Sequence, residues 1–406
     1  MIKLNIKQVA EILHAKLIGN ADVEVENIST DTRKQANNGL FFALKGEKFD
    51  AHNYLPDALA QGCVAAVVEY QCDVAAPQLV VKDTRIALGQ LAKWLKAEIH
   101  PRTVAITGSS GKTTVKEMTA SILRQSAVDA DDVLYTQGNF NNDIGVPLTL
   151  LRLTNQHKFA VIELGANHLG EIAYTTNLAR PDVALVNNVA AAHLEGFGSI
   201  EGVAQAKGEI YQGLAPDGVA IINLDCHYLP LWQSNINGRK VRSFSTKNSQ
   251  ADYYASDIHM HEACARFELH SPQGQIEINL PYLGEHNISN ALAATALAMS
   301  VGATLQHVKQ GLEHQSQVKG RLFPIQPCEN LLLLDDTYNA NVDSLQSAIN
   351  VLQKYSAFRI LVVGDMAELG ENTLACHQQV ADFAKQAELD LILSCGEESS
   401  VISAAG

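Results

Sequence analysis

Apolar positions in the first hundred residues predict short strands mixed with helices. Runs at Phe41–Leu44 and Val64–Glu69 are short and bounded by polar residues, as expected for strands. From Asp83 to Ile99 apolar residues recur every three or four positions, which predicts an amphipathic helix. His100-Pro101 follows directly, and a proline at this point ends a helix.

A different rhythm begins at Thr103, where strand-like apolar runs alternate with helical patterns. The runs are Val104–Thr107, Ala160–Leu164, Val183–Val186 and Val219–Asn223. Strands that alternate with helices form mostly parallel sheets covered by those helices. We therefore expect an α/β domain in the middle of the chain.

A third block opens near Gly320 and again has the α/β pattern. Its apolar runs at Leu331–Leu334, Ile360–Val363 and Leu389–Leu393 predict buried strands with helices between them. The sequence stops soon after the last run, so we expect an interrupted domain. The predicted division is 1–82, 83–318 and an incomplete 319–406.

Composition narrows the class of protein. A length of 406 residues exceeds what one hydrophobic core usually supports. The net charge of −14 argues against nucleic acid and against an anionic membrane surface as partners. We expect no membrane insertion and no signal peptide, because apolar runs of the required lengths are missing. Seven scattered cysteines without a C-x-x-C pair indicate reduced thiols in a cytoplasm and support no zinc module.

The segment Thr103–Thr114 reads TVAITGSSGKTT, an apolar strand followed by a glycine-rich turn and a helix. Glycines let backbone N–H groups point at a phosphate, and the helix N-terminus adds a favourable dipole. Lys112 supplies a mobile charge and Thr113 a hydroxyl for Mg²⁺. The strict Walker spacing is absent, since Ile106 stands where its first glycine belongs. The alternative is an ordinary serine/glycine turn before a helix.

Glu163 ends a predicted parallel strand, where side chains face the ligand crevice. A carboxylate there is suited to Mg²⁺, which prefers oxygen ligands and shared phosphates. The alternative is a solvated glutamate at a strand end. His193 follows another strand through the small-residue segment AAAHLEG, and the pattern leaves a structural role and a site role equally open.

Lys207 falls on the apolar stripe of a predicted helix, Ile200–Leu214. One interpretation is a lysine that buries its methylenes and extends its ammonium outward. The other is a lysine buried beside the site, whose lowered pKa leaves a neutral amine. A neutral amine takes up CO₂ to form a carbamate, an anionic metal ligand.

Taken together, these residues resemble the Mur ligase family over nearly the whole chain. The matching segments, in family order, are TGSSGKTT, YTQGNFNNDIGVPLTLL, ELGANHLGEI, HLEGFGS, AKGEI, HNISNALAA, GR, DDTYNAN and GDMAELG. Within the family, GNFNNDIGVP, DDTYNAN and GDMAELG are similar to the members that add D-alanyl-D-alanine. The N-terminal ISTDTR and LFFALKGEKFDAH resemble the part that holds the UDP end of a nucleotide sugar.

The resemblance implies a three-domain α/β enzyme with a small mixed α/β UDP-binding domain, a central P-loop ATPase domain and a truncated Rossmann-like C-terminal domain. ATP would phosphorylate the terminal carboxylate of UDP-N-acetylmuramoyl-tripeptide, and the amine of D-alanyl-D-alanine would displace phosphate from the acyl phosphate. Its implied cofactors are ATP, two Mg²⁺ ions and the CO₂-derived carbamate on Lys207. It also implies a monomer in a bacterial cytoplasm.

The resemblance carries site residues over by position. Catalytic roles are implied for Lys112, Lys207, His193 and Arg321. ATP would contact Gly108, Ser109, Ser110, Gly111, Lys112, Thr113, Thr114, Asn287, Asn290, Arg321 and Asp336. The metal ligands would be Thr113, Glu163, His193 and the carbamate of Lys207. Substrate would contact Ser29, Thr30, Asp31, Arg33, Lys45, Gly46, Asn139, Asn142, His168, Tyr338, Asn339 and Ser344. For Asn287 and Asn290 the alternative role is N-capping of a helix near His286–Val301.

The chain departs from the family pattern at a few positions. Thr32 stands where serine is more usual, and Val342 replaces a proline that helps a helix begin. Further strands and a lysine-bearing KGS-type segment of the family are missing, so we expect truncation or loss there. Alternative functions are another Mur-type or folylpolyglutamate-type ligase, or a P-loop NTPase without ligase activity. Lysine and diaminopimelate both remain possible as the third residue of the tripeptide.

Overall fold

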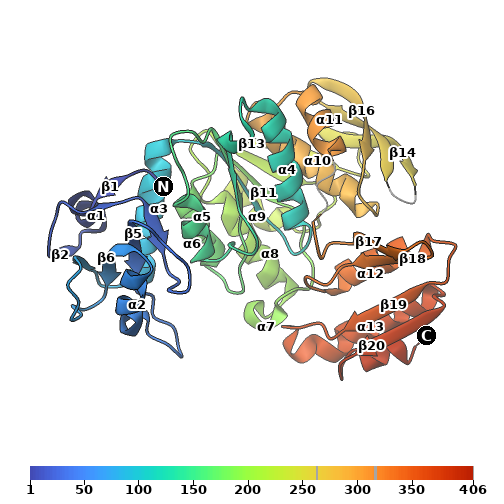
Figure 1. Ribbon diagram of the computed structural model, residues 1–406. Coiled ribbons are helices and arrows are strands. Elements are labelled where there is room, and N and C mark those ends of the chain that lie inside the picture. Colours follow the sequence, from blue (N-terminus) through green and yellow to red (C-terminus); the bar gives the residue numbers. More distant parts are fainter. Residues whose placement is uncertain (262–263, 315–317, 406) are drawn as a thin grey trace.

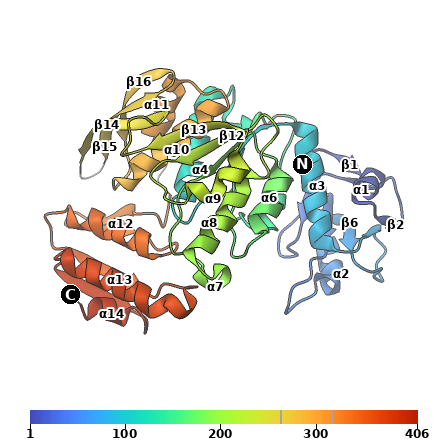
Figure 2. The same cartoon turned by 180° about the vertical axis from the view of Figure 1, so that it is seen from behind.

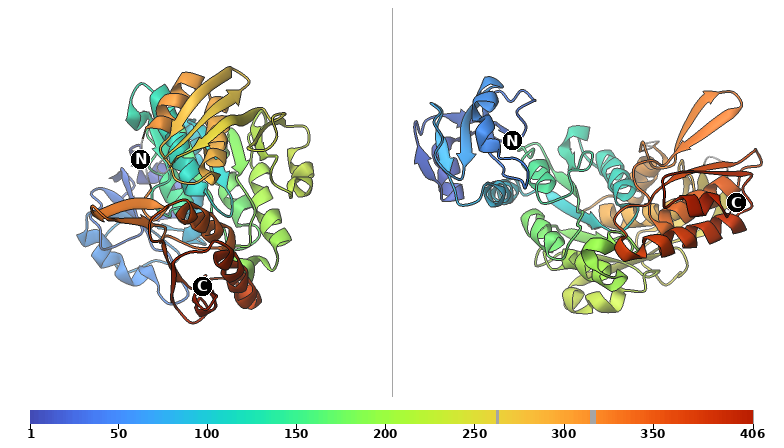
Figure 3. Two further views of the ribbon diagram at one scale, coloured as in Figure 1. Left: turned by 90° about the vertical axis from the view of Figure 1, so that its right-hand side faces the viewer. Right: turned by 90° about the horizontal axis from the view of Figure 1, so that it is seen from below.

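In the computed structural model, which describes residues 1–261, 264–314 and 318–405, three sheet-containing units follow one another along the chain. Figure 1 shows the N-terminal unit and the C-terminal unit on opposite sides of a larger central unit, and the right-hand view of Figure 3 shows the same separation from below. The α/β class and the parallel central sheet predicted from the sequence are confirmed.

The N-terminal unit is built on a five-stranded sheet in the order β2-β7-β6-β5-β4. Its strands are β2 (Lys16–Ile18), β4 (Asn27–Ser29), β5 (Gly39–Phe42), β6 (Cys63–Val68) and β7 (Gln78–Val80). β4 to β7 are parallel, and only β2 runs the other way. The remaining elements are β1 (Leu4–Asn5), β3 (Glu24–Val25), α1 (Ile6–Leu13), a 3-10 turn (Ala51–Tyr54) and α2 (Leu55–Ala60).

Helix α3 (Thr84–Ile99) joins the N-terminal unit to the central one. Asp83 caps it, since its side chain accepts from the Ile86 N–H, and His100 ends it in the left-handed conformation. One side of α3 contacts α1 and β5, and the other contacts α5 and α6 of the central unit. Figure 2 shows α3 lying between the N-terminal sheet and α6.

The central unit contains a nine-stranded sheet in the order β16-β15-β14-β13-β12-β11-β8-β10-β9. Its strands are β8 (Arg102–Thr107), β9 (Val133–Tyr135), β10 (Phe159–Glu163), β11 (Val183–Val186), β12 (Val219–Asn223), β13 (Lys240–Ser245), β14 (Tyr253–Met260), β15 (Ala265–Ser271) and β16 (Gly274–Leu280). Strands β8 to β14 pair in parallel, while β14, β15 and β16 form an antiparallel ribbon. The sequence pattern did not predict this ribbon.

Helices cover both faces of the central sheet. They are α4 (Lys112–Ser126), α5 (Gly145–Leu150), α6 (Glu171–Ala179), α7 (Leu194–Phe197), α8 (Ile200–Gly208), α9 (Leu229–Ile236), α10 (His286–Ser300) and α11 (Leu305–Glu313). Alternate residues of a strand point to opposite faces, so Val104 and Ile106 pack with α4 and α10 while Ala105 joins the core that contains α5 and α6 residues. The helix expected at 200–214 is α-helical only to Gly208 and continues as a 3-10 turn, Glu209–Tyr211.

The C-terminal unit contains an antiparallel hairpin and a parallel strand pair. The hairpin is β17 (Phe323–Cys328) with β18 (Leu331–Asp335), and the pair is β19 (Ile360–Gly364) with β20 (Leu391–Cys395). Its helices are α12 (Val342–Gln353), α13 (Thr373–Gln386) and α14 (Ser400–Ser403), and a 3-10 turn spans Gly370–Asn372.

The expectation that these C-terminal strands are buried is wrong for β18, in which no residue is buried, and for every second residue of β19 and β20. Leu331 to Leu333 in β18 are 42–46% exposed, and Val362 in β19 is 68% exposed. Leu361, Val363 and Ile392 point the other way and are buried in a core shared with α12 and α13 residues. The reason is that helices cover only one face of the β19–β20 pair, so alternate residues remain in solvent.

None of the described helices has the length and apolar character that crossing a bilayer requires.

Candidate active site

Three parallel strands bring their carboxyl ends to one edge of the central sheet. β8, β10 and β11 are neighbours in the order β11-β8-β10 and run in the same direction. The glycine-rich loop follows β8, Glu163 ends β10, and Asn187 follows β11. The predicted phosphate loop and the predicted carboxylate therefore lie side by side, at the edge where parallel sheets bind ligands.

The loop after β8 ends at Gly111, the N-cap residue of α4. Its φ of 75° is in the left-handed region that favours glycine. A Cβ atom here would lie 2.6 Å from Asn290 Oδ1 and 2.7 Å from Asn187 Nδ2, so a side chain does not fit. The Lys112 ammonium donates to the Gly108 carbonyl at 2.7 Å, and burial lowers the pKa of this amine. A glycine-rich loop at a helix N-terminus suits a phosphate.

A second loop, residues 187–190, holds the phosphate loop in place. Asn188 Oδ1 accepts from the Ser110 N–H at 2.8 Å, and Asn188 Nδ2 donates to Ser110 Oγ at 2.9 Å. The Ser109 N–H donates to the Asn188 carbonyl at 3.1 Å, and the Ser109 hydroxyl donates to the Ala190 carbonyl at 3.1 Å. The loop was not predicted from the sequence, although it directly follows the predicted strand Val183–Val186.

A chain of asparagine side chains runs from the phosphate loop to α10. Asn187 Nδ2 donates to Asn290 Oδ1 at 3.1 Å, and Asn290 Nδ2 donates to Asn287 Oδ1 at 2.8 Å. Asn287 Nδ2 donates in turn to the Leu283 carbonyl at 2.7 Å. The N-cap residue of α10 is Glu285, and its side chain makes no capping bond. The two predicted asparagines therefore do not cap the helix and belong to a buried network beside the loop.

This network borders a cavity of about 200 Å³ between the central and C-terminal units. Several residues predicted to contact ATP line this cavity, namely Ser110, Gly111, Thr114, Asn287, Asn290, Arg321 and Asp336. It is also lined by Asn187, Asn188, Asn223, Tyr282, Leu283, His286, Ser289, Val318, Leu322, Ser344 and Ser347. Burial raises the pKa of Asp336 to about 6. A hydrogen bond from the Leu322 N–H to Asp336 Oδ1, at 3.1 Å, acts in the opposite direction and lowers this pKa.

A second cavity of about 410 Å³ adjoins the first, because Ser110, Gly111, Arg321 and Ser344 line both. It gathers Ser109, Lys112, Glu163, His193, Lys207, Asn139, Asn142, Tyr338 and Asn339 from the residues predicted to act. Residues that were not predicted also line it, namely Asn141, Gly165, Ala166, Asn167, Glu171, Asn341 and Glu368. Most of the catalytic, metal and acceptor residues predicted from the sequence therefore meet in one cleft.

Lys207 is buried in this cavity wall, with 3% of its surface exposed. Its Nζ lies 6.0 Å from the centre of the Phe197 ring. Burial, and then the neighbouring Lys112 charge, lower the pKa of Lys207 well below its usual value. Of the two interpretations of this lysine, the buried one is therefore correct.

His193 contacts Glu368 across the two units, through its Nδ1 and a carboxylate oxygen. The Glu195 N–H also donates to the Glu368 carbonyl at 3.3 Å. Burial lowers the pKa of His193, and the Glu368 charge opposes this shift. The segment GDMAELG thus reaches the central unit beside the cavity.

Among residues 1–261, 264–314 and 318–405, no three histidine, cysteine, aspartate or glutamate side chains converge to hold a metal ion. Glu163 nevertheless carries a buried carboxylate oxygen, Oε2, without a hydrogen-bond partner. An uncompensated buried oxygen is costly, and a cation offsets that cost. Mg²⁺ fits a site with few protein ligands, because it usually keeps waters and substrate phosphates.

On the C-terminal side of the cleft, the Arg321 guanidinium lies over the Tyr338 ring at 4.2 Å from its centre. Helix α12 begins at Val342 without the proline usual in the family, because Asn341 and Ser344 form a capping box. The Ser344 hydroxyl accepts from the Asn341 N–H at 2.9 Å. This predicted substrate residue therefore stabilises the helix start as well as lining both cavities.

Other predicted residues lie outside the two cavities. Gly108 and Thr113 belong to the phosphate loop and α4 but line neither cavity. His168 is exposed and contacts Glu171 at 3.2 Å. Residues predicted for the UDP end lie in the N-terminal unit: Ser29, Thr30, Asp31, Arg33, Lys45 and Gly46.

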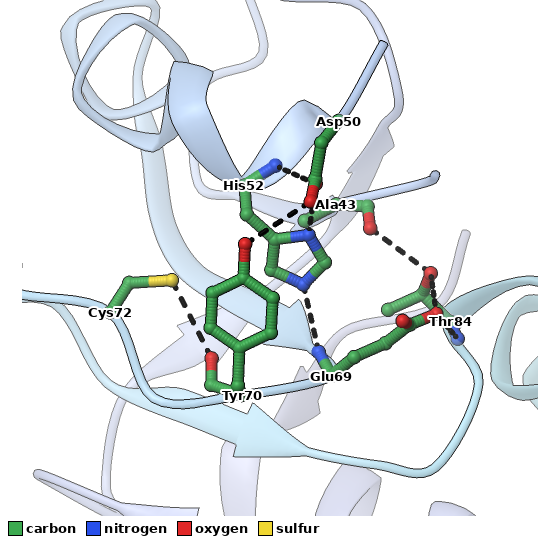
Figure 4. Close-up of polar contacts among 7 residues, drawn as sticks. All are labelled: Ala43, Asp50, His52, Glu69, Tyr70, Cys72 and Thr84. Carbon is green, nitrogen blue, oxygen red and sulfur yellow. Dashed lines mark hydrogen bonds and ion pairs between the residues drawn. The ribbon is translucent and has the colours of Figure 1, made fainter. Parts of the chain in front are cut away.

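These N-terminal residues follow the carboxyl ends of the parallel strands β4 and β5, and β6 ends beside them. Figure 4 shows the network that supports this edge. His52 Nδ1 donates to Asp50 Oδ1 at 2.5 Å, and its Nε2 accepts from the Glu69 N–H at 2.8 Å. Tyr70 stacks on the His52 ring at 4.4 Å and donates to Asp50 Oδ2 at 3.1 Å. Neither described cavity extends to this edge.

Two family models match the chain. The Mur ligase middle domain matches residues 106–298, and the model described as Mur ligase, glutamate ligase domain matches residues 320–405. The larger cavity is lined entirely from within these two segments, and so is the smaller one except at Val318.

Similar proteins carry one common description. The UDP-N-acetylmuramoyl-tripeptide–D-alanyl-D-alanine ligase of Haemophilus influenzae is 65% identical over 406 residues, which cover 100% of this chain and 88% of that protein. The Escherichia coli protein of the same description is 54% identical, and the match covers 100% of this chain and 88% of that protein.

Among solved structures, MurF from Acinetobacter baumannii superimposes with a TM-score of 0.94 at 39% identity, covering 100% of this chain and 88% of that one. MurF ligase from Thermotoga maritima in complex with ADP superimposes with a TM-score of 0.83 at 27% identity, covering 93% of this chain and 86% of that one. Folylpolyglutamate-type structures from L. casei reach only 0.58 at 16% identity and share the fold alone.

Proposed function

The chain belongs to the Mur ligase family, and from this premise we propose that it joins D-alanyl-D-alanine to UDP-N-acetylmuramoyl-tripeptide. It is an ATP-dependent, ADP-forming amide ligase of peptidoglycan precursor synthesis, and so serves cell-wall growth, cell shape and division. The observation that carries the proposal is the cleft itself. The phosphate loop, Glu163, Lys207, Arg321 and Tyr338 line one cavity.

The chemistry needs a phosphorylated carboxylate, because a free carboxylate is a poor electrophile. The γ-phosphate of ATP passes to the terminal carboxylate of the tripeptide, and the amine of the dipeptide then displaces inorganic phosphate. Lys112 and the loop amides bind the triphosphate, while Arg321 approaches it from the C-terminal unit. Holding both reactants in one cleft and stabilising charge supply most of the catalysis.

We assign the nucleotide and acceptor ends from the cavity linings. Asn287, Asn290 and Asp336 bind the adenosine part of ATP in the smaller cavity. Asn139, Asn142, Tyr338 and Asn339 contact the tripeptide and the dipeptide in the larger one. The remaining predicted contacts lie elsewhere: Ser29, Thr30, Asp31, Arg33, Lys45, Gly46 for the UDP end, and His168 near the sugar-peptide.

For the metal, we propose that Thr113 and Glu163 hold one Mg²⁺ ion and that His193 and a carbamylated Lys207 support a second. Bound Mg²⁺ neutralises phosphate charge and orients the transferred group. The buried, unpartnered Glu163 oxygen supports the first ion. The low pKa of the buried Lys207 amine supports carbamylation, since only a neutral amine reacts with CO₂.

The finer organisation is also a proposal. We divide the chain into a UDP-binding domain (1–82), an ATP-binding domain (83–318) and a Rossmann-like domain (319–406). We propose a monomer that works in the bacterial cytoplasm, where its nucleotide substrates and its free thiols belong. We assign diaminopimelate to the third position of the tripeptide, because an Acinetobacter baumannii relative at 38% identity is named as a ligase of the 2,6-diaminopimelate peptide.

A phosphate-release assay with the purified chain, ATP, Mg²⁺ and UDP-N-acetylmuramoyl-tripeptide tests the function. D-alanyl-D-alanine should start phosphate release and yield a product heavier by the dipeptide, while L-glutamate or free diaminopimelate should not. Tripeptides with lysine and with diaminopimelate are compared in parallel. Phosphate release that is the same with every amine would instead identify an NTPase without ligase activity.

A further inference from the structure

The two oxygens of the Glu163 carboxylate have different surroundings. Oε1 accepts a hydrogen bond from Asn141 Nδ2 at 2.9 Å, whereas the buried Oε2 has no partner. The residue is only 2% exposed. A carboxylate with one oxygen anchored and the other free is prepared to receive a cation from a fixed direction.

Asn141 is itself held firmly against the strand that carries Glu163. Its carbonyl accepts from the Gly165 N–H at 2.8 Å, and its own N–H donates to the Asn139 carbonyl at 2.8 Å. A Cβ atom on Gly165 would lie 3.0 Å from Asn141 Cγ and Oδ1. The absence of a side chain at Gly165 therefore permits the close approach of the amide.

The other end of the same loop is tied to the strand and to the phosphate-loop helix. Thr136 Oγ1 accepts from the Glu163 N–H at 3.0 Å. The buried Lys116 ammonium of α4 donates to the Thr136 carbonyl at 2.8 Å. Residues 136–141 thus form a bridge between α4, whose N-terminus follows the phosphate loop, and the carboxylate at the end of β10.

The bridge also faces the acceptor side of the cleft, since its Asn139, like the adjoining Asn142, lines the same cavity as Glu163 and Asn141. The exposed Asn139 side chain and the partly buried Asn141 side chain are only two residues apart. One short loop therefore contacts both the predicted substrate region and the predicted metal ligand.

We propose that Asn141 is a positioning residue, whose amide fixes Glu163 Oε1 so that Oε2 binds the divalent cation that accompanies ATP. The amide N–H can only donate, so it favours the ionised carboxylate and prevents its rotation. The proposal rests on the proposed function, and extends it to a residue that acts through Glu163. Outer-shell partners of this kind typically change metal affinity about 10–100-fold.

The test is direct cation binding, measured by electron paramagnetic resonance with Mn²⁺ as the probe, in the presence of ADP. For Asn141→Ala we expect the Mn²⁺ dissociation constant to rise at least about tenfold. The KM for ATP at saturating Mg²⁺ should change less than about threefold, on the order of the smallest effects of a lost hydrogen bond. Gln137→Ala is the matched control, because it removes an exposed amide from the same loop, and it should leave Mn²⁺ affinity unchanged.

A double-mutant cycle with Glu163→Gln separates positioning from a general loss of structure. If Asn141 acts through Glu163, Asn141→Ala should weaken Mn²⁺ binding no further in the Glu163→Gln background. Full additivity, or wild-type Mn²⁺ affinity in Asn141→Ala, would overturn the proposal. The proposed function fails separately, if wild-type protein binds Mn²⁺ with ADP yet shows no D-alanyl-D-alanine-dependent phosphate release.

Discussion

Lys207 illustrates how much a single residue can reveal when its environment contradicts its chemistry. A lysine ammonium is strongly hydrated, yet this side chain is 3% exposed and lies near a second, half-buried lysine, Lys112. Both features favour the neutral amine. Under our proposal this amine reacts with CO₂, and the resulting anion would suit a cleft that holds cations beside the phosphates of ATP.

Replacement of Lys207 should therefore abolish ligation. We expect Lys207→Ala to reduce dipeptide-dependent phosphate release at least about 100-fold, a loss typical of a removed charge-stabilising group. Bicarbonate should rescue it poorly, because no amine remains. Lys207→Arg keeps a cation but cannot form the carbamate, so it should be equally inactive. ¹³C-bicarbonate NMR should show a carbamate signal only in wild type, and near-normal turnover of the alanine variant would reject the idea.

Asp336 gives the cleft a pH-dependent stability. Burial raises its pKa to about 6 from 3.8, so between these values the folded chain keeps a proton that the unfolded chain loses. The contribution of protonated Asp336 to the free energy of unfolding is complete below pH 3.8 and is lost as the pH rises through 6. Asp336→Asn should therefore be more stable than wild type above pH 6, by up to about 2–3 kcal/mol, and equally stable near pH 3.

The neighbouring Asp335 provides a control of opposite sign. Hydrogen bonds from Thr337 lower the pKa of this carboxyl. Asp335→Asn should therefore lower the melting temperature at neutral pH, where the ionised carboxylate accepts those bonds. Scanning calorimetry between about pH 3 and pH 8 measures both variants. If the melting temperatures of Asp336→Asn and wild type changed in parallel with pH, the proposed effect of burial on the Asp336 pKa would be contradicted.

At the scale of elements, the strand ends were the most predictable part of the site. Apolar runs identified β8, β10, β11 and β12, and their parallel order places Glu163 next to the phosphate loop. Asn141, Asn187 and Asn188 were missed, because their importance lies in contacts between loops that are distant in sequence. A neutral amide gives no charge or periodicity signal by itself.

The pattern of apolar residues also failed to predict the exposure of β18 and the presence of the antiparallel ribbon β14–β16. Leu331 to Leu333 form a continuous apolar run that resembles a buried strand, yet they lie in a two-stranded hairpin and are largely exposed. In β14–β16 apolar and polar residues alternate weakly, since one face of the ribbon packs on α10 and α11 and the other meets solvent. Only the tertiary arrangement decides such cases.

The loop at 187–190 should control ATP binding through the phosphate loop. Asn188→Ala removes the hydrogen bonds that fix both the backbone and the hydroxyl of Ser110. Loss of about 1.4 kcal/mol corresponds to a roughly tenfold rise in KM for ATP, while the KM for the dipeptide should stay within about twofold. Asn177→Ala, which removes a surface amide bonded to Lys93, is the control. Unchanged KM for ATP would show that the loop needs no such support.

For the whole molecule, the division of the cleft between two units predicts closure. Arg321 and Tyr338 approach from the C-terminal side, and Glu368 contacts His193 of the central unit. Within Lys319–Arg321, Gly320 has a φ of 75°, in the left-handed region that favours glycine. We therefore expect this junction to act as a hinge that tightens when both substrates are bound.

Small-angle X-ray scattering measures this closure. The radius of gyration should fall when a non-hydrolysable ATP analogue and UDP-N-acetylmuramoyl-tripeptide are added together, and fall less with either ligand alone. ADP without the tripeptide nucleotide is the control. Superimposable profiles in all of these conditions would argue against a hinge at this junction.

The shared lining of the cleft has a consequence for inhibition. Because the cavity walls come from both sides of the Lys319–Arg321 junction, a rigid molecule that fills it would hold the walls apart, as a wedge does. Such a compound need not imitate either substrate, since it would act by keeping Arg321 away from the triphosphate. Resistance would then arise at lining residues outside the phosphate loop, far more readily than in that loop, whose geometry leaves little room for change.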